Sequence, residues 1–270
     1  MRGDDRGVLV CRACGCGFLE HELTPAELDS IYHSSYFVEE HPGYTKDILA
    51  QVDDPRSCQN ILLDRIERFR PLKDARFIDV GAAAGVMMLA ARKRGAVVRG
   101  VEPSEFASRH AVEQLGLNVQ CATLEDAKLD GEVFDVATLI DVIEHVTDLQ
   151  GDMKKLRSCL APGGLLALLT PNFRLRRLLG RRWHGFNASY EHLLYMDERS
   201  LRVLLRRHGF RVLHIETLGM VDLAQYYLRP VARALPAGIV AFINRLFSKL
   251  LRAANSEHRL FMVAQVDDGK

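Results

Sequence analysis

Short apolar runs alternate with helical stretches over most of this 270-residue chain, and this alternation constrains the fold more than any other feature. The runs have the length and residue types of buried strands, and the stretches between them carry apolar residues at helical spacing. The predicted strands are residues 77–80, 97–101, 118–121, 134–140, 165–169, 210–215 and 260–264. Strands that alternate with helices predict an α/β fold with a seven-stranded, mostly parallel sheet and helices on both faces.

One main domain is expected, because neither a repeat nor a long Pro/Gly/Ser linker divides the chain. Residues 1–55 are interpreted as an irregular N-terminal arm and residues 56–270 as the main domain. Two stretches, 171–195 and 218–255, are interpreted as insertions that cap a substrate site. Apolar residues at helical spacing within the second stretch predict an amphipathic helix. We expect this helix to pack on the sheet domain as a lid, and a place on a membrane surface is the alternative.

Composition and charge exclude several classes of protein. Hydrophobic residues make up 48% of the chain and charged residues 26%, which is typical of a folded protein and not of a disordered one. No apolar run reaches the roughly 20 residues that span a bilayer, and no apolar signal core lies near the start. We therefore expect a cytoplasmic protein without a transmembrane segment.

The distribution of charge bears on the partners. The net charge is +1 and residues 1–170 are acidic overall, which argues against nucleic acid as a partner. Residues 171–270 hold 17 Lys and Arg against 8 Asp and Glu. Five arginines of this part could hold an anionic acceptor, although a solvated face is the default interpretation: Arg174, Arg176, Arg177, Arg181 and Arg182. The sequence leaves homo-oligomerisation open.

The six cysteines lack the spacing of a disulfide framework, so reduced thiols are expected. Cys11-Arg-Ala-Cys14-Gly-Cys16 contains the C-x-x-C-G form of one zinc-ribbon knuckle, but no second pair follows it. His21, His33 or Cys58 could complete a tetrahedral site. A knuckle that binds no metal is the alternative.

A glycine-containing loop and a later carboxylate predict a nucleoside site. Asp79-Val-Gly81-Ala-Ala-Ala-Gly85 follows the first predicted strand of the main domain, and Glu102 ends the next one. Glycines at such a turn let the backbone approach a ligand, and a carboxylate about 20 residues farther on suits the hydroxyls of a ribose. The G-x-G-x-x-G pattern of dehydrogenases is absent from this loop.

Four stretches together resemble the class I S-adenosylmethionine-dependent methyltransferase family, whose fold is Rossmann-like. They are Phe77-Ile-Asp-Val-Gly-Ala-Ala-Ala-Gly85, Gly100-Val-Glu-Pro-Ser104, Phe134-Asp-Val-Ala-Thr-Leu-Ile-Asp-Val-Ile-Glu-His-Val146 and Leu160-Ala-Pro-Gly-Gly-Leu165. The Asp-Val-Ile-Glu-His-Val form is similar to the branch that contains the ubiquinone-biosynthesis O-methyltransferases and methyltransferases of polysaccharide and natural-product clusters. The resemblance covers residues 64–266 approximately.

The resemblance implies S-adenosylmethionine as the cofactor and assigns its contacts. The loop would lie along the methionine moiety, Glu102 would accept hydrogen bonds from both ribose hydroxyls, and residues after the later strands would flank the adenine and the underside of the cofactor. The implied cofactor residues are Asp79, Gly81, Ala82, Ala83, Gly85, Glu102, Pro103, Ser104, Thr123, Leu124, Ile140, Asp141 and Val142. Ala83 departs from the family, because many relatives have a central glycine there.

By this resemblance the reaction is methyl transfer to a small molecule, with a hydroxyl of a sugar, polyketide or aromatic intermediate favoured as the acceptor. His145, at the end of the fourth predicted strand, is the first candidate for a general base, and a purely structural role is the alternative. His192 is the second candidate, and Glu144 would orient a partner. We expect no catalytic metal, because a sulfonium is already activated. A non-catalytic nucleoside-binding scaffold and a C- or N-directed methyltransferase are the alternatives.

Overall fold

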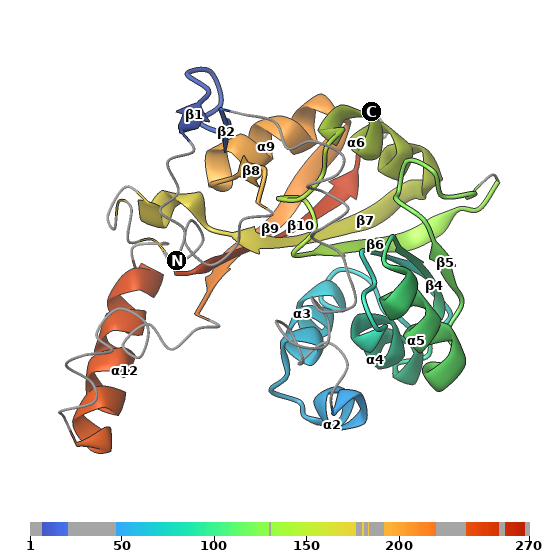
Figure 1. Ribbon diagram of the computed structural model, residues 1–270, viewed down its shortest axis with the longest axis horizontal. Coiled ribbons are helices and arrows are strands. Elements are labelled where there is room, and N and C mark those ends of the chain that lie inside the picture. Colours follow the sequence, from blue (N-terminus) through green and yellow to red (C-terminus); the bar gives the residue numbers. More distant parts are fainter. Residues whose placement is uncertain are drawn as a thin grey trace.

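The structure is a computed structural model that describes residues 7–20, 47–129, 131–176, 180, 183, 192–219, 236–253 and 257–267. Seven strands form one sheet in the order β5-β4-β3-β6-β7-β10-β9 (Figure 1). The five strands from β5 to β7 are parallel, whereas β10 runs antiparallel to both β7 and β9. The predicted seven-stranded, mostly parallel sheet is therefore confirmed. Its strands are β3 (Arg76–Val80), β4 (Val97–Glu102), β5 (Val119–Cys121), β6 (Phe134–Ile140), β7 (Leu160–Pro171), β9 (Phe210–Leu218) and β10 (Arg259–Val266).

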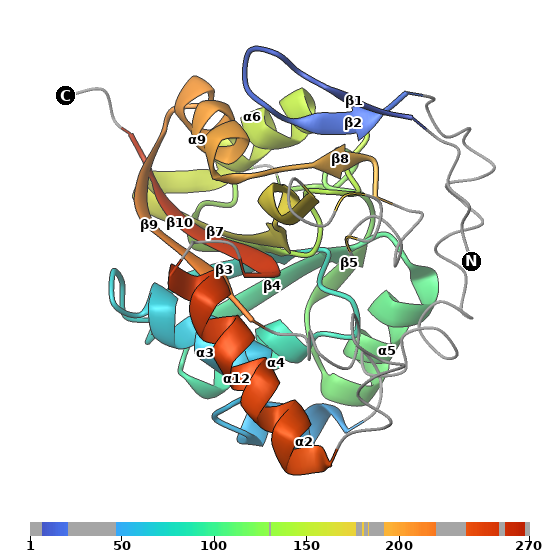
Figure 2. The ribbon, with the colours of Figure 1, turned by 90° about the vertical axis from the view of Figure 1, so that its left-hand side faces the viewer.

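Helices cover both faces of this sheet, as expected (Figure 2). One face packs against α6 (Leu149–Cys159) and α9 (Glu198–Arg207), and the other against α3 (Cys58–Ile66) and α4 (Val86–Lys93). The next helix, α5 (Glu105–Leu115), packs beside α4 through Ala111 and Met88. Three of these helices begin at a polar cap: the side chains of Ser57, Ser104 and Asp197 each accept a hydrogen bond from a backbone N–H in the first turn.

The side chains of the central strand β3 pack against the helices on both faces of the sheet. Ile78 and Val80 pack on the α6 and α9 side, whereas Phe77 packs on the α3 and α4 side, and all three are buried. Successive side chains of a strand point to opposite faces, so a strand with helices on both sides is apolar throughout. Asp79 is the polar residue among the buried residues of β3, which makes it a candidate functional position.

One strand boundary differs from the sequence expectation. β7 begins at Leu160, five residues before the predicted strand 165–169, and the extra residues form an irregularity against β6. Gly163 allows this course because its φ is +67°. Helix α6 begins after Asp148, whose side chain accepts a hydrogen bond from the Gly151 N–H.

The N-terminal arm is more regular than expected. A hairpin of β1 (Val8–Val10) and β2 (Gly17–Leu19) pairs with the short strand β8 (Leu194–Tyr195) to form a second, three-stranded sheet. Helix α2 (Ile48–Asp53) buries Ile48 and Val52 among the residues of α3 and α4. These elements form because their apolar side chains find partners on the main domain, which local composition does not reveal. The aromatic residues Tyr32, Tyr36, Phe37 and Tyr44 lie outside the described residues.

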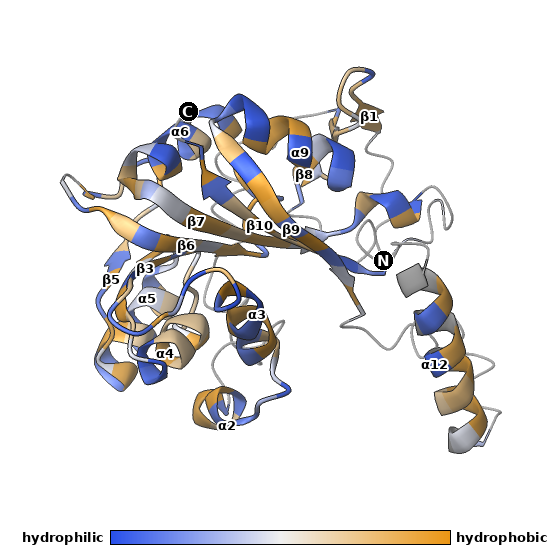
Figure 3. Cartoon of the chain, turned by 180° about the vertical axis from the view of Figure 1, so that it is seen from behind, coloured by the Kyte–Doolittle hydropathy of each residue, from blue (hydrophilic) through white to orange (hydrophobic). Residues whose placement is uncertain are grey.

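Helix α12 (Ala237–Ala253) lies within the predicted amphipathic stretch and stands apart from the helices that cover the sheet (Figure 1). The expected packing of its apolar stripe on the sheet domain is not found in the described residues: Phe242, Leu246 and Leu250 are exposed. Figure 3 shows hydrophobic colour along much of this helix. Among the described helices, none has the length and apolarity to cross a bilayer.

Candidate functional site

Glu102, the last residue of β4, occupies the position predicted for a ribose-binding carboxylate and is 4% exposed. Its Oε2 accepts a hydrogen bond of 2.8 Å from the Ala83 N–H, and its Oε1 accepts one of 2.8 Å from the Ser104 N–H. Burial raises the pKa of Glu102 to about 7, and the two backbone donors act in the opposite direction. The carboxylate is thus fixed between the loop after β3 and the start of α5.

Asp79 lies on the neighbouring strand and is 3% exposed. Its Oδ1 accepts a hydrogen bond of 2.6 Å from the Thr138 hydroxyl of β6. Burial raises the pKa of Asp79 to about 7; the Thr138 hydroxyl lowers it, and the nearby charge of Glu102 raises it. Two buried carboxyl groups with raised pKa values at adjacent strand ends are typical of a site that receives a cationic or hydroxylated ligand.

The loop between β3 and α4 passes close to its neighbours. Gly81 has a φ of +69°, and a Cβ there would lie 2.3 Å from Cγ2 of Val142. Ala83, the residue that departs from the family pattern, also has a positive φ of +45°. For a residue with a Cβ this left-handed conformation costs roughly 1–2 kcal/mol. The loop therefore keeps the shape of a glycine-rich turn in spite of the substitution.

The loop between β3 and α4 also lies against the residues that follow β6. The backbone carbonyl of Val142, whose side chain abuts Gly81, accepts a hydrogen bond of 2.9 Å from the His145 N–H. Ile140 ends β6, and Asp141 follows with a φ of +58° and an ion pair to Arg259. The predicted residues at the ends of β3 and β6 are therefore neighbours.

The residues predicted to border adenine follow β5. The Ala122 N–H donates a hydrogen bond of 3.2 Å to the backbone carbonyl of Glu102, so this segment lies beside the end of β4. Thr123 Oγ1 lies 2.9 Å from a carboxylate oxygen of Asp126, and Leu124 is buried. Pro103 presents its backbone carbonyl to the thiol of Cys121. These contacts fix the position of the segment after β5, but none of them joins one of its side chains to the carboxylate of Glu102.

Glu144, His145 and His192 converge at the end of β6. The imidazole rings of the two histidines lie 4.9 Å apart in an edge-to-face arrangement. Glu144 is 2% exposed, and its Oε1 lies 3.9 Å from Nε2 of His192. Its Oε2 accepts a hydrogen bond of 3.0 Å from the Thr170 hydroxyl. The backbone carbonyl of Glu144 accepts hydrogen bonds from the N–H groups of Leu193 and Leu194, which hold the segment of His192 in place.

These three side chains also have the donor types of a divalent-cation site. One ligand atom from each lies within 4.8 Å of the others, and among the described residues this is the one group of three or more His, Cys, Asp and Glu that meets this criterion. The sequence alone does not show that these residues meet, because His192 comes from a segment far from the Glu-His pair in the chain. The expectation of no catalytic metal stays a prediction.

The cysteines of the knuckle lie in the turn between β1 and β2. Backbone N–H groups of Cys14 and Ala13 lower the pKa of Cys11, whereas burial raises the pKa of Cys16 to about 12. His21 and His33 lie outside the described residues, and Cys58 lies in α3. Zinc binding by Cys11, Cys14 and Cys16 stays a prediction.

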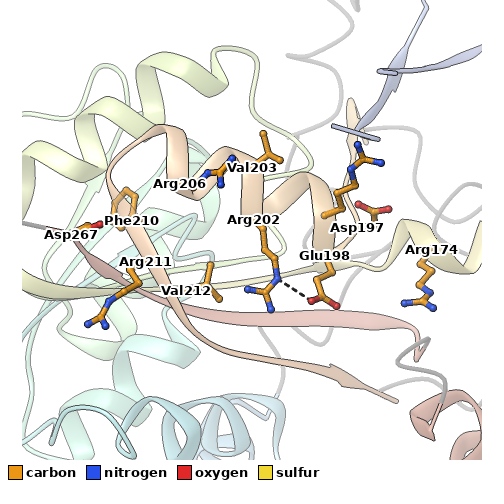
Figure 4. Close-up of a pocket in the computed structure, with 11 residues that line it drawn as sticks. Arg174, Asp197, Glu198, Arg202, Val203, Arg206, Phe210, Arg211, Val212 and Asp267 are labelled. Carbon is orange, nitrogen blue, oxygen red and sulfur yellow. Dashed lines mark hydrogen bonds and ion pairs between the residues drawn. The ribbon is translucent and has the colours of Figure 1, made fainter. Parts of the chain in front are cut away.

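The arginine-rich surface is a separate feature. Arg174 lines a hollow of about 860 Å³ beside α9 and β9, together with Arg202, Arg206 and Arg211 (Figure 4). Arg202 pairs with Glu198 in this hollow, and none of the predicted cofactor or base residues lines it. Arg176 lies over the Phe173 ring. Arg177, Arg181 and Arg182 lie outside the described residues.

Sequence reasoning missed the residues that hold the predicted ones in place. Thr138 binds Asp79, Thr170 binds Glu144, and Arg259 pairs with Asp141. A polar residue inside a predicted central strand was the available signal for Thr138. Thr170 lies near the end of β7 and Arg259 begins β10. These two strands pair with each other, so only the sheet order places both residues here.

Comparison with known proteins gives a family for this arrangement. A family model described as "Methyltransferase domain" matches residues 55–215, which is more than half of the chain. A ubiquinone biosynthesis O-methyltransferase of Parvibaculum lavamentivorans is 39% identical over 112 residues, which are 40% of this chain and 44% of the relative. The chain thus spans about half the length of the curated relatives that it matches.

Solved structures share the fold at low sequence identity. Phosphoethanolamine N-methyltransferase 2 of Haemonchus contortus, in complex with S-adenosyl-L-methionine, is 17% identical with a TM-score of 0.58, over 93% of this chain and 61% of that one. The [4+2]-cyclase SpnF is 16% identical with a TM-score of 0.56, over 87% and 97%. At this level the likeness concerns the fold alone. The sheet order, the buried carboxylates beside the loop and the match over residues 55–215 agree, and the chain belongs to the methyltransferase domain family.

Proposed function

We propose that this protein is an S-adenosylmethionine-dependent methyltransferase that transfers a methyl group to a hydroxyl of a small molecule. The observation that carries the proposal is Glu102, a buried carboxylate that is held at the end of β4 by two backbone donors beside a loop of left-handed residues. A carboxylate at this place in an open α/β sheet suits the two ribose hydroxyls of an adenosyl group. The neighbour of the same fold that contains S-adenosyl-L-methionine supports this choice of cofactor.

Within this proposal, residues on four segments hold the cofactor. Asp79 and residues 81–85 lie along the methionine moiety, and Glu102, Pro103 and Ser104 flank the ribose. Thr123 and Leu124 border the adenine, and residues 140–142 lie beneath the cofactor. The two buried carboxyl groups would be ionised once a cationic ligand and its hydroxyl donors compensate their burial, because an opposite charge and hydrogen bonds to the charged form both lower a carboxyl pKa.

The chemistry at the acceptor falls to the histidine cluster. S-adenosylmethionine supplies an activated methyl group, so the protein mainly has to align the acceptor behind that methyl. His145 takes the proton of the acceptor hydroxyl, since an imidazole with an ordinary pKa of about 6.5 suits that task near neutral pH. His192 and Glu144 position His145. The ring of His192 meets that of His145 edge to face, and Glu144 lies against His192.

Two observations support a hydroxyl as the group that accepts the methyl. The curated relatives are named O-methyltransferases of ubiquinone biosynthesis, which favours a hydroxyl over nitrogen or carbon. The half-buried His145 beside buried His192 offers a base for such a hydroxyl. We propose a hydroxylated sugar, polyketide or aromatic intermediate as the acceptor.

A non-catalytic nucleoside-binding scaffold is the second candidate, because the residues that suit a nucleoside, Glu102 and the loop after β3, require no catalysis. The two are separated by incubating the protein with S-adenosylmethionine and panels of hydroxylated, amine and carbon acceptors, with mass spectrometry of the products. The proposal predicts that a hydroxylated compound gains one methyl group while S-adenosylhomocysteine forms in equal amount. Binding of the cofactor without methylation across all panels would favour the scaffold, and a methylated amine or carbon would redirect the assignment.

A further inference from the structure

Helix α12 presents a stripe of large apolar side chains that the described protein does not cover. Ile239, Phe242, Leu246 and Leu250 are 46%, 68%, 50% and 59% exposed. They recur every three or four residues, so they share one side of the helix. Exposed apolar residues that are scattered singly are ordinary, but four in one row on a helix mark a surface that binds something.

The charges of α12 are of one sign. Residues 237–253 contain Arg245, Lys249 and Arg252 and no Asp or Glu. Arg245 and Lys249 are exposed. At 100° per residue these two residues fall on one border of the apolar stripe, with Lys249 close to the angular position of Phe242. Long basic side chains at the border of an apolar stripe can keep their charges in water while their carbon chains lie along an apolar phase.

These charges decide between the occupants that could cover the stripe. A second copy of the helix would bring Arg245 and Lys249 near the same cations of its partner, and α12 has no carboxylate to pair with them. Like charges at such a contact are unfavourable. A bilayer with anionic lipid offers both an apolar phase for the stripe and phosphates for the cations.

The length of α12 fixes how it would lie on a bilayer. Its 17 residues make a helix of about 25 Å, shorter than the hydrocarbon core of roughly 30 Å. The apolar residues occupy one side only, and the cations line its border. Such a helix lies in the plane of the membrane surface and does not cross it.

We infer that α12 docks this protein on an anionic lipid surface. Ile239, Phe242, Leu246 and Leu250 enter the boundary between headgroups and acyl chains, and Arg245 and Lys249 contact lipid phosphates. This docking is independent of the proposed methyl transfer, since none of the predicted cofactor or base residues belongs to α12.

Flotation of the full chain with vesicles tests the inference. Vesicles of phosphatidylcholine with phosphatidylglycerol should carry the protein, and vesicles of phosphatidylcholine alone should carry much less. Phe242→Ser/Leu246→Ser should lower the partition coefficient on anionic vesicles at least tenfold, because two buried apolar side chains are lost. Leu49→Ser/Val112→Ser is the matched control: these residues are also exposed, at 66% and 44%, but lie on α2 and α5. This control should float like the wild type.

A charge variant probes the other half of the inference. Arg245→Gln/Lys249→Gln should weaken flotation with anionic vesicles about tenfold and remove most of its dependence on salt. All substituted side chains are exposed, and circular dichroism and thermal melting of each variant report whether the fold is kept. Equal flotation of the Phe242→Ser/Leu246→Ser variant and the wild type would overturn the inference. So would absence of flotation together with a dimer, seen by light scattering, that this variant dissociates; the stripe would then bind a second copy.

Discussion

The ends of β3 and β4 and the end of β6 are two corners of one site, yet they are built differently. At the first corner, Asp79, Ala83, Glu102 and Ser104 come from one continuous stretch, and backbone N–H groups hold the carboxylate of Glu102. At the second corner, Glu144 and His145 meet His192, which arrives from a distant segment and is held through backbone bonds to Glu144.

Under the proposed function, this difference separates cofactor binding from the chemistry. We expect a substitution at the first corner to change the affinity for the cofactor more than the reaction. We expect a substitution at the second corner to change proton transfer. We therefore expect the two corners to respond independently to substitution, and the predictions below test that independence.

The largest effect is expected at His145. If His145 is the base toward a hydroxyl, His145→Ala should lower kcat by roughly 10²–10⁴, since general base catalysis contributes about this factor. The pH profile of kcat/KM should also lose its acidic limb near the pKa of histidine. Steady-state kinetics measure both kcat and the pH profile of kcat/KM, with the acceptor that the panel experiment identifies as the substrate.

His192→Ala serves as the comparison within this corner. It should lower kcat less than His145→Ala does, because His192 positions the base and does not take the proton. A wild-type kcat in His145→Ala would reduce His145 to a structural role. A larger loss in His192→Ala would move the base to that residue.

The next effect concerns pH at the first corner. The pKa of Glu102 is raised to about 7 in the free protein, so the carboxyl is largely protonated below that pH. If ribose hydroxyls bind the ionised form, the affinity for S-adenosylhomocysteine should fall about tenfold from pH 8 to pH 6, because binding must release a proton there. Calorimetric titration at both pH values measures this, and Glu102→Gln, which cannot ionise, should bind more weakly with a flatter pH profile. A wild-type affinity that rises toward pH 6 would have the wrong sign for this account.

A smaller effect is expected from Ala83→Gly. The φ of +45° at Ala83 costs roughly 1–2 kcal/mol, and a glycine removes that strain while adding up to about 1 kcal/mol of chain entropy to the unfolded state. The variant should therefore be more stable by up to about 1 kcal/mol in denaturant unfolding. Ala84→Gly is the control: Ala84 is buried without a positive φ, so its replacement should destabilise the protein. Equal destabilisation by both changes would show that Ala83 carries no strain.

The smallest effect is expected from chelation. We propose that methyl transfer proceeds without a metal, so turnover should be unchanged in a chelating buffer, even if zinc leaves the N-terminal knuckle. Loss of turnover that magnesium or manganese restores would show instead that Glu144, His145 and His192 hold a cation at the second corner.

The sequence predicts the first corner better than the second, for a physical reason. Local patterns fix the strands and the carboxylates Asp79 and Glu102 near the strand ends, because each depends on nearby residues. The sheet of seven strands followed from the same patterns. Contacts such as Thr138 with Asp79 depend instead on which strands become neighbours, and no local pattern reports that.

Tertiary packing also accounts for the remaining differences. The N-terminal arm forms β1, β2 and α2 because its apolar residues find partners on the main domain. His192 was a candidate from its residue type, but its distance to Glu144 could not be inferred. The exposure of Phe242 and Leu246 on α12 was not foreseen, since an apolar stripe predicts that something covers it and does not say what.

The affinity for S-adenosylhomocysteine of two variants tests the central claim most directly. Calorimetric titration should show at least a tenfold loss in Glu102→Ala, because two charge-assisted hydrogen bonds of about 1.5–3 kcal/mol each are removed, and nearly wild-type affinity in His145→Ala. That result would establish the first corner as the cofactor site and leave the chemistry to the second. An unchanged affinity in Glu102→Ala would contradict the account.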